Sequence, residues 1–200
     1  MLQVCNITVT CKLPSIGQNR KIDLNELQKA FSMSIYNPKK FKALIVKWDR
    51  DGDLPKFTAL IFSNCKCVIV GVKNVSDAKK ACNTIADKVY VHLLNKNDDD
   101  DDNHHDKHEK NYNDFEIRNI VCSGDVNQKI CLHSFYKANK AFCLFDQETF
   151  SPGLYYRPTT NKMLAIIFYN GKIIITGSNS LEKSIELYDL LRKKLLRHKK

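Results

Sequence analysis

The sequence predicts an α+β fold in which two similar halves build one antiparallel sheet with helices on one of its faces. Residues 59–74 (ALIFSNCKCVIVGVKN) and 165–180 (AIIFYNGKIIITGSNS) align without a gap and share seven of 16 residues. Each copy has an apolar run, a short polar break and a second apolar run, which is typical of a β-hairpin. The predicted elements around the two copies also follow the same order, as expected for an internal repeat.

The first half begins with alternating residues and continues through a capped helix to the hairpin. Asp23 is a candidate N-cap, and Glu26 three residues later completes a capping-box pattern. Asn74 opens the cap of a second helix. The predicted elements of this half are strand 4–13, helix 23–33, strand 42–48, hairpin 57–70 and a helix ending near Leu94.

The second half repeats this order, with strand 117–123, helix 132–143, strands 154–157 and 163–176, and a last helix capped at 179–182. Asn6 matches Asn119 at an offset of 113, Phe41 matches Phe150 at 109, and Phe62 matches Phe168 at 106. Differences in loop length explain this drift. We therefore predict repeats at 1–95 and 115–200, joined by a linker at 96–114.

The linker is rich in Asp, Asn, His and Lys. His104, His105 and His108 lie among carboxylates and could bind a metal, but nothing apolar anchors the segment. Such a composition is typical of a solvated, disordered loop. No metal site is predicted.

The charge balance favours a polyanionic partner. The net charge is +10, and residues 98–110 hold seven of the 22 acids but only two of the 32 basic residues. The rest of the chain therefore carries +15, which favours nucleic acid first and an anionic membrane second. No run approaches the 18 apolar residues of a membrane span, and the start is not a signal peptide. The eight cysteines lack a C-x-x-C pair, and most of them alternate with apolar residues in predicted strands, as core thiols would in a reducing compartment.

The hairpins are apolar on both faces, and the predicted helices can cover only one. They are expected on the side of Ile61 and Ile69, which leaves no element for the opposite side. A sheet buried on both sides is the alternative. An uncovered apolar face is instead a surface for a partner. The uncovered side carries Leu60, Phe62, Val68, Val70, Ile166, Phe168, Ile174 and Thr176.

Several motifs, in order and spacing, resemble the TATA-box-binding protein family. They are YNPKKF at 36–41, TALIF at 58–62, FEIRNIVCSGDV at 115–126, PGLYYR at 152–157 and the IIF…GKIIITG strand pair. The resemblance covers 2–95 and 115–197. It implies a saddle, with one curved sheet and helices on its convex face. It also implies a nuclear general transcription initiation factor that binds the minor groove of A·T-rich promoter DNA, is not an enzyme and has no cofactor.

The resemblance also implies the site residues. Phe41 with Phe62, and Phe150 with Phe168, would insert between base steps and bend the duplex. The implied groove contacts are Asn6, Thr8, Leu60, Val68, Val70, Asn119, Val121, Ile166, Ile174 and Thr176. The implied phosphate contacts are Lys39, Lys40, Lys47, Lys66, Lys73, Arg157 and Lys172. TFIIA, TFIIB and TBP-associated factors would contact Lys79, Lys80, Lys88, Asp146 and Glu148.

Three departures from the family pattern put the DNA preference in doubt. Thr8 stands where the family usually has Val, Val70 stands where it has Thr, and Ser151 is inserted after Phe150. The alternative is a paralogue that acts mainly as a protein scaffold in transcription. An enzyme is disfavoured because no paired carboxylates, nucleophile–base pair or metal cluster lies on the predicted face. The protein is expected to act as a monomer on DNA, with self-association off DNA left open.

Overall fold

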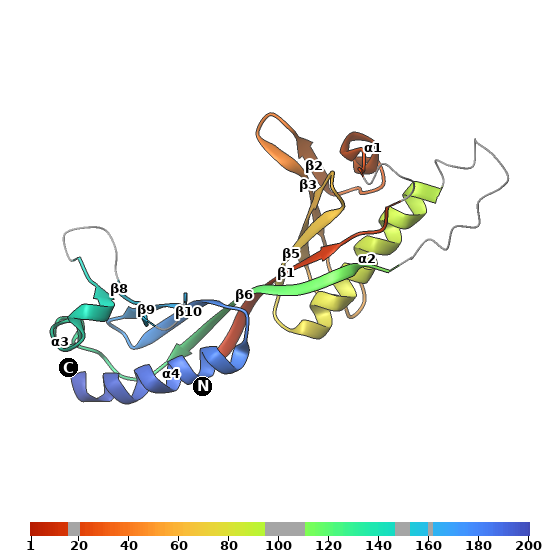
Figure 1. Ribbon diagram of the computed structural model, residues 1–200. Coiled ribbons are helices and arrows are strands. Elements are labelled where there is room, and N and C mark those ends of the chain that lie inside the picture. Colours follow the sequence, from red (N-terminus) through yellow and green to blue (C-terminus); the bar gives the residue numbers. More distant parts are fainter. Residues whose placement is uncertain (16–20, 95–110, 147–152, 160–161) are drawn as a thin grey trace. The chain divides into compact units, whose positions relative to one another are not determined.

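The computed structural model of the chain describes residues 1–15, 21–94, 111–146, 153–159 and 162–200 (Figure 1). Its strands are hydrogen-bonded in the order β2-β3-β4-β5-β1-β6-β10-β9-β8-β7. Contacts divide the chain into two compact units. The N-terminal unit is Ile7–Ile117, and the C-terminal unit is Met1–Asn6 with Arg118–Lys200. These boundaries fall inside β1 and β6, whereas the repeats predicted from the sequence meet at 96–114, most of which lies outside the described residues.

The N-terminal unit contains the strands expected from the alternating runs. They are β1 (Gln3–Lys12, shared with the other unit), β2 (Ser34–Asn37), β3 (Phe41–Trp48), β4 (Phe57–Phe62) and β5 (Lys66–Val72). The helices are α1 (Leu24–Gln28) and α2 (Val75–Leu94). The paired strands β1–β5, β2–β3, β3–β4 and β4–β5 are all antiparallel. The predicted hairpin and the long helix ending at Leu94 are confirmed.

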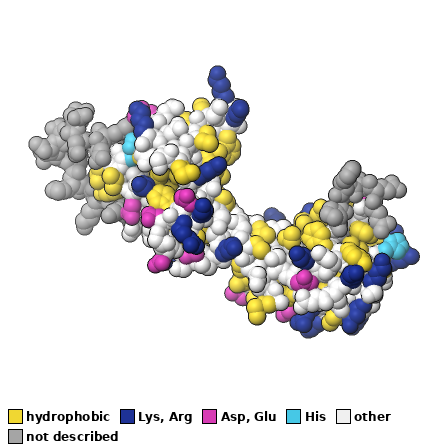
Figure 2. Space-filling view, turned by 180° about the vertical axis from the view of Figure 1, so that it is seen from behind, with side chains coloured by type: hydrophobic (Ala, Val, Ile, Leu, Met, Phe, Trp, Pro, Cys, Tyr) yellow, Lys and Arg dark blue, Asp and Glu magenta, His cyan; other side chains and the backbone are white. Residues whose placement is uncertain are grey.

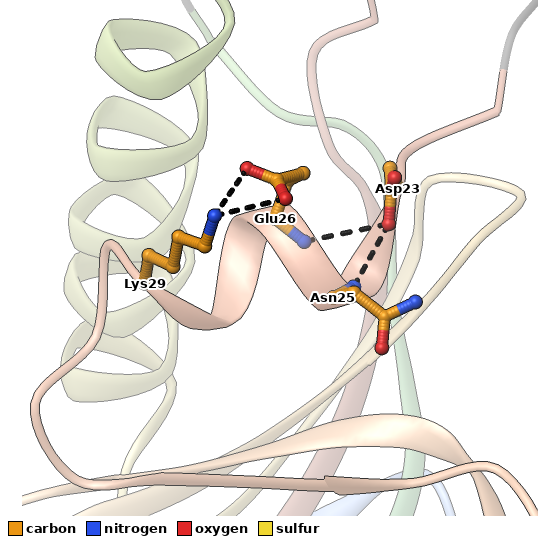
Figure 3. A network of polar contacts seen from close by, with 4 residues as sticks. All are labelled: Asp23, Asn25, Glu26 and Lys29. Atoms are coloured by element: carbon orange, nitrogen blue, oxygen red, sulfur yellow. Dashed lines mark hydrogen bonds and ion pairs between the residues drawn. The ribbon is translucent and has the colours of Figure 1, made fainter.

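Helix α1 begins as predicted but is shorter than the predicted 23–33. Asp23 Oδ1 accepts hydrogen bonds from the backbone N–H groups of Asn25 (2.9 Å) and Glu26 (3.4 Å), and Glu26 forms an ion pair with Lys29 (Figure 3). After Gln28 the chain tightens into i→i+3 bonds, from Ala30 N–H to the Leu27 carbonyl (3.0 Å) and from Phe31 N–H to the Gln28 carbonyl (3.1 Å). The Ser34 hydroxyl also donates to the carbonyls of Gln28 (3.2 Å) and Phe31 (2.8 Å), which satisfies acceptors at the end of the helix.

Helix α2 covers one face of the N-terminal sheet. Ile61 and Ile69 on that face are fully buried, as are Cys82 and Ile85 of α2. All eight cysteines are described and are free thiols. The pKa values of Cys67 and Cys82 are raised, first by hydrogen bonding to Cys11 and then by burial. Both groups therefore remain protonated core thiols, as expected for most of the cysteines, whereas Cys5 is exposed and Cys131 and Cys143 are half-buried.

The C-terminal unit repeats the pattern. Its strands are β6 (Asn113–Asp125, shared with the other unit), β7 (Cys143–Leu144), β8 (Gly153–Tyr156), β9 (Leu164–Phe168) and β10 (Lys172–Ser178). Its helices are α3 (Leu132–Ala138) and α4 (Leu181–Leu195), with 3₁₀ turns η1 (Lys140–Phe142) and η2 (Leu196–His198). Helix α4 runs along one side of β8–β10 (Figure 1), and its Leu191 is buried together with Ile167 and Ile175.

The predicted helix 132–143 is wrong in its second half. Helix α3 stops at Ala138, because Asn139 leaves helical geometry (φ −129°) and its side-chain amide donates to the Phe135 carbonyl at 3.0 Å. The chain then makes a 3₁₀ turn and enters β7. An asparagine that hydrogen-bonds a preceding carbonyl offers the backbone a local alternative to the helix.

Candidate nucleic-acid interface

The N-terminal unit leaves one sheet face partly exposed. Strand register places five residues in a row across this face, from β2 to β1: Ile35, Ile45, Leu60, Val68 and Thr10. On β3, β4, β5 and β1 the neighbours of these residues along the chain point the other way and are buried, whereas those of Ile35 are half-buried; Thr10, at the inner end of the row, is itself buried. Side chains opposite each other in a ladder lie on one face, so this row, with Thr58, Phe62 and Val70 on the same side, forms a surface that we call the N-terminal face.

The C-terminal unit has an equivalent surface, the C-terminal face. Its row runs from β7 to β6 through Leu144, Tyr155, Ile166, Ile174 and Ser123, with Leu164, Phe168 and Thr176 on the same side. Leu144 lies 109 positions after Ile35, Ile166 lies 106 after Leu60, and Ser123 lies 113 after Thr10. These are the offsets seen in the sequence repeat, so the register reproduces the predicted pseudo-symmetry.

The residues expected on the uncovered side, all apolar except Thr176, are partly exposed in both units. Leu60, Phe62, Val68, Val70, Ile166, Phe168, Ile174 and Thr176 all retain solvent contact. At the two outer edges, Ile35 is 57% exposed and Leu144 is 70% exposed. The alternative of a sheet buried on both sides therefore does not describe either unit.

Two of the predicted wedge residues form a pair at one end of the N-terminal face. Phe41 begins β3 and Phe62 ends β4, and their rings meet edge to face with centroids 6.3 Å apart. Phe41 is 44% exposed. Phe62 stands opposite Ala43, whose small side chain leaves room beside the ring. The pair is accessible from solvent.

The second pair is described for one member only. Phe168 ends β9 and is partly exposed, whereas Phe150 and the inserted Ser151 lie outside the described residues. Phe168 stands opposite Gly153. A Cβ at Gly153 would lie 2.9 Å from Ile166 Cγ2 and 3.4 Å from Phe168 Cδ1, so glycine lets this ring sit close to the neighbouring strand.

The polar groups of the two faces differ. In the C-terminal unit, the Thr176 hydroxyl and the Asn119 amide hydrogen-bond each other at 3.2 Å, and Gly177 N–H donates to Asn119 Oδ1 at 2.8 Å. The Asn119 amide is therefore held in a fixed orientation. Val70 occupies the position equivalent to Thr176, 106 residues earlier, and supplies no hydroxyl. Asn6, Thr8 and Val121 lie on β1 and β6 and are partly buried.

The residues predicted to contact phosphates are all exposed but are spread along the strands and turns. Lys39 and Lys40 occupy the turn between β2 and β3, and Lys47 lies opposite Thr58 on the N-terminal face. The others stand at or just beyond strand ends: Lys66, Lys73, Arg157 and Lys172. Figure 2 shows lysine and arginine side chains at many separate places on the visible surface of both units.

The predicted partner-binding residues lie away from the two faces. Lys79, Lys80 and Lys88 are on α2 and are exposed. Two of them rest over aromatic rings: Lys79 Nζ is 5.8 Å from the Phe115 ring centre and Lys88 Nζ is 5.5 Å from that of Trp48. Asp146 is exposed after β7, and Glu148 lies outside the described residues.

Sequence reasoning missed several residues of both faces. The structure adds Ile35, Ile45, Thr58, Ser123, Leu144, Tyr155 and Leu164. It also adds Lys12, which stands opposite Lys66 at the end of the N-terminal face. Ile45 and Lys12 share the parity of residues already placed on this face, so alternation along strands 42–48 and 4–13 could have identified them.

Comparison with known proteins agrees with this architecture. A family model described as transcription factor TFIID, or TATA-binding protein (TBP), matches residues 1–92 and 114–198. The chain is 32% identical to TATA-box-binding protein 2 of Entamoeba histolytica over 92% of its own length and 76% of the relative's. It is 35% identical to the TATA-box-binding protein of Candida albicans over 88% of its length and 64% of the relative's.

A solved structure of Methanococcus jannaschii TBP has the same fold. It superposes with a TM-score of 0.75 and 26% identity and covers 98% of each chain. The family model spans both sequence repeats, and the structural likeness extends over nearly all of both units. The chain belongs to the TATA-binding protein family.

Proposed function

We propose that this protein is a general transcription initiation factor that binds A·T-rich promoter DNA in the minor groove and bends it. The observation that carries the proposal is the pair of equivalent, partly exposed apolar faces, each with phenylalanine at the end of a strand. The names of its relatives, TATA-box-binding proteins, support it. Nuclear localisation and the absence of catalysis are part of the same proposal.

Each face suits a duplex whose minor groove has been widened. Sugar edges and base edges exposed by unstacking can pack on aliphatic side chains such as Leu60, Val68, Ile166 and Ile174, and this burial removes apolar surface from water. The Phe41 and Phe62 rings would enter between two base pairs and replace part of the stacking that is lost there. Phe168 would do the same with Phe150 on the other face.

Base preference would come from the amide of Asn119 and its counterpart Asn6. An amide N–H can donate to adenine N3 or thymine O2, whereas the guanine amino group obstructs this approach. Thr176 and Gly177 orient the Asn119 side chain before DNA arrives. Orientation in advance lowers the entropic cost of forming the contact. The result is a preference for A·T over G·C with little power to distinguish A·T from T·A.

Phosphate contacts and partner contacts complete the proposal. Lys39, Lys40, Lys47, Lys66, Lys73, Arg157 and Lys172 would neutralise backbone phosphates and give a salt-dependent affinity. TFIIA, TFIIB and TBP-associated factors would be recruited through α2 and through the segment of Asp146 and Glu148. On DNA the protein would act as a monomer.

The deciding experiment is a bending assay on a TATA duplex labelled at both ends for energy transfer. We expect wild type to bend the TATA duplex and to bind a G·C duplex more weakly at the same salt concentration. Phe62→Ala and Phe168→Ala should lose bending to a greater extent than salt-dependent non-specific binding. Ile185→Ala is the matched control, because Ile185 is an exposed apolar residue on α4. Equal binding of both duplexes without bending would refute the proposal.

A scaffold paralogue is the second candidate, and the exchange at Thr8 and Val70 motivates it. The N-terminal face then lacks a hydroxyl where the C-terminal face has Thr176, and base reading there would be weaker. This alternative predicts binding of TFIIA or TFIIB without selectivity for TATA duplexes. Measuring both affinities with the same preparation separates the two candidates.

A further inference from the structure

Two lysines face each other at the end of the N-terminal face. Lys12 ends β1 and Lys66 begins β5, and the two are direct register partners, next to the Thr10–Val68 pair. Lys12 therefore shares a side of the sheet with Val68 and Val70. Cβ atoms of such partners lie about 5 Å apart, and like charges in this arrangement repel. The repulsion between the two lysines therefore destabilises this part of the sheet.

Within the described residues, neither Lys12 nor Lys66 forms an ion pair; the pairs of Lys29 with Glu26 and of Lys56 with Asp49 lie elsewhere in this unit. The turn beside Lys66 is held by its own backbone, because Lys66 N–H donates to Asn64 Oδ1 at 3.2 Å. The ammonium groups are therefore available to a ligand with negative charge.

The equivalent position of the C-terminal face has the opposite chemistry. Lys172 begins β10, as Lys66 begins β5, and its turn is closed in the same way by Asn170 Oδ1 at 3.1 Å. Its register partner is Asp125, which lies 113 positions after Lys12. Asp125 Oδ1 accepts a hydrogen bond from Asn127 N–H at 2.7 Å and so stays beside the strand. One face thus ends in two positive charges, and the other ends in one of each sign.

We propose that Lys12 and Lys66 form a phosphate-binding pair that holds the DNA backbone at the end of the N-terminal face. The C-terminal face lacks this pair, because Asp125 opposes Lys172 and repels phosphate. This inference rests on the proposed DNA-binding function. It adds Lys12 to the proposed phosphate contacts, and it predicts that the N-terminal face binds the DNA backbone more strongly than the C-terminal face does.

This difference in phosphate binding between the two faces can be measured from the salt dependence of DNA binding. Each lysine that neutralises a phosphate releases counterions, and removing one such contact lowers the slope of log K against log salt by about 1. Lys66 acts beside a second cation, whereas Lys172 acts beside a carboxylate. Loss of Lys66 should therefore weaken binding more than loss of Lys172, even though the two residues occupy equivalent positions.

The test measures fluorescence anisotropy of a TATA duplex with the full chain between 50 and 200 mM salt. We expect Lys12→Gln to lower the slope by about 1, so that its deficit is roughly fourfold larger at 50 mM than at 200 mM salt. Lys66→Gln should lower the slope by more than Lys172→Gln does. Asp125→Asn keeps an oxygen that can accept from Asn127 N–H, and it should bind more tightly than wild type.

Lys183→Gln is the matched control, because Lys183 is an exposed lysine in the first turn of α4. It should leave the slope unchanged. The inference is overturned if Lys12→Gln keeps the slope of wild type, or if Lys183→Gln changes it equally. Failure of the proposed function would look different: wild type would bind TATA and G·C duplexes equally, while the slopes of the variants on either duplex would still report on Lys12.

Discussion

The N-terminal and C-terminal faces share a register but not a chemistry. Both rows are set by antiparallel hairpins whose residues pair in the same way, Leu60 with Val68 and Ile166 with Ile174. The side chains on the two faces differ at equivalent positions: Val70 is the equivalent of Thr176, and Lys12 is the equivalent of Asp125. The buried residues on the helix side therefore fix the backbone pattern of both repeats, while the residues on the exposed side can differ between them.

The largest expected effect comes from breaking one of the two equivalent hairpin turns. Gly171 has φ +91°, and an added Cβ would lie 2.4 Å from the Gln128 carbonyl oxygen. Gly171→Ala should lower the free energy of unfolding by about 3 kcal/mol, through backbone strain and forced movement of that carbonyl. Urea denaturation followed by circular dichroism measures the loss.

Cys65, which occupies the position equivalent to Gly171 in the turn between β4 and β5, is the control. It is buried and already carries a side chain at φ +65°. Cys65→Ala removes only the sulfur, and we expect a loss of about 1 kcal/mol. If Gly171→Ala cost no more than Cys65→Ala, close contact at the second turn would not be what distinguishes the two hairpins.

The next effect concerns the hydroxyl that only the C-terminal face has at this position. Thr176→Val removes the hydrogen bonds between the hydroxyl and Asn119 while keeping the shape of the side chain. We expect a loss of about 1 kcal/mol in the free energy of unfolding. The proposed selectivity for A·T over G·C duplexes should also fall about fivefold, the equivalent of about 1 kcal/mol.

The reciprocal change sharpens the same comparison. Val70→Thr places a hydroxyl on the N-terminal face and should raise the selectivity for A·T duplexes, as measured by competition binding at fixed salt. Unchanged selectivity in both variants would show that the Asn119–Thr176 pair has a structural role only.

A smaller effect is expected at the caps of the two long helices. Asn74 Oδ1 accepts from Asp77 N–H at 2.7 Å, and Ser180 Oγ, 106 residues later, accepts from Lys183 N–H at 3.3 Å. Asn74→Ala and Ser180→Ala should each cost about 1 kcal/mol in thermal or urea unfolding. The shorter bond at Asn74 predicts the larger loss of the two.

The smallest expected effect is a change in the pKa of one carboxyl group, that of Glu182. The Ser180 hydroxyl donates to Glu182 Oε2 at 2.6 Å, and this hydrogen bond lowers the pKa of the fully exposed Glu182 carboxyl. The bond therefore contributes to stability above the unfolded pKa of Glu182, and this contribution is lost as the pH falls through the folded pKa. In Ser180→Ala, carbon-detected NMR titration should show the pKa of Glu182 rising. An unchanged value would exclude this hydrogen bond as the cause.

Most of the fold follows from the sequence because the repeat and the alternation are strong signals. The identities in 59–74 and 165–180 predicted two hairpins, and burial of Ile61 and Ile69 with exposure of Leu60 and Val68 follows from strand parity. The helix ends could not be predicted as well. Backbone i→i+3 bonds close α1, with Ser34 bonding the Gln28 carbonyl from six residues away, and Asn139 ends α3 through a side-chain bond. Such competition depends on where the chain turns next.

The candidate site was predictable in its apolar part and less so in its polar part. Phe41 and Phe62 could be named as a pair only through the resemblance to the family, and the structure brings their rings together. The bonds that fix Asn119 could not be derived, because they link positions 57 residues apart. Lys12 was missed because it ends a strand beside a loop, where a lysine is usually only a solvated side chain.

The boundaries of the two units along the chain set a limit on dissecting this protein. Residues Met1–Asn6 belong by contacts to the C-terminal unit, and Ile7–Ile117 includes the first residues of β6. Each repeat therefore contains a strand segment that belongs to the other unit, so that a cut in the linker between the repeats would leave each fragment without a segment of its own unit. We expect the separated repeats to aggregate or to complement each other when mixed, as two pieces of a split protein do.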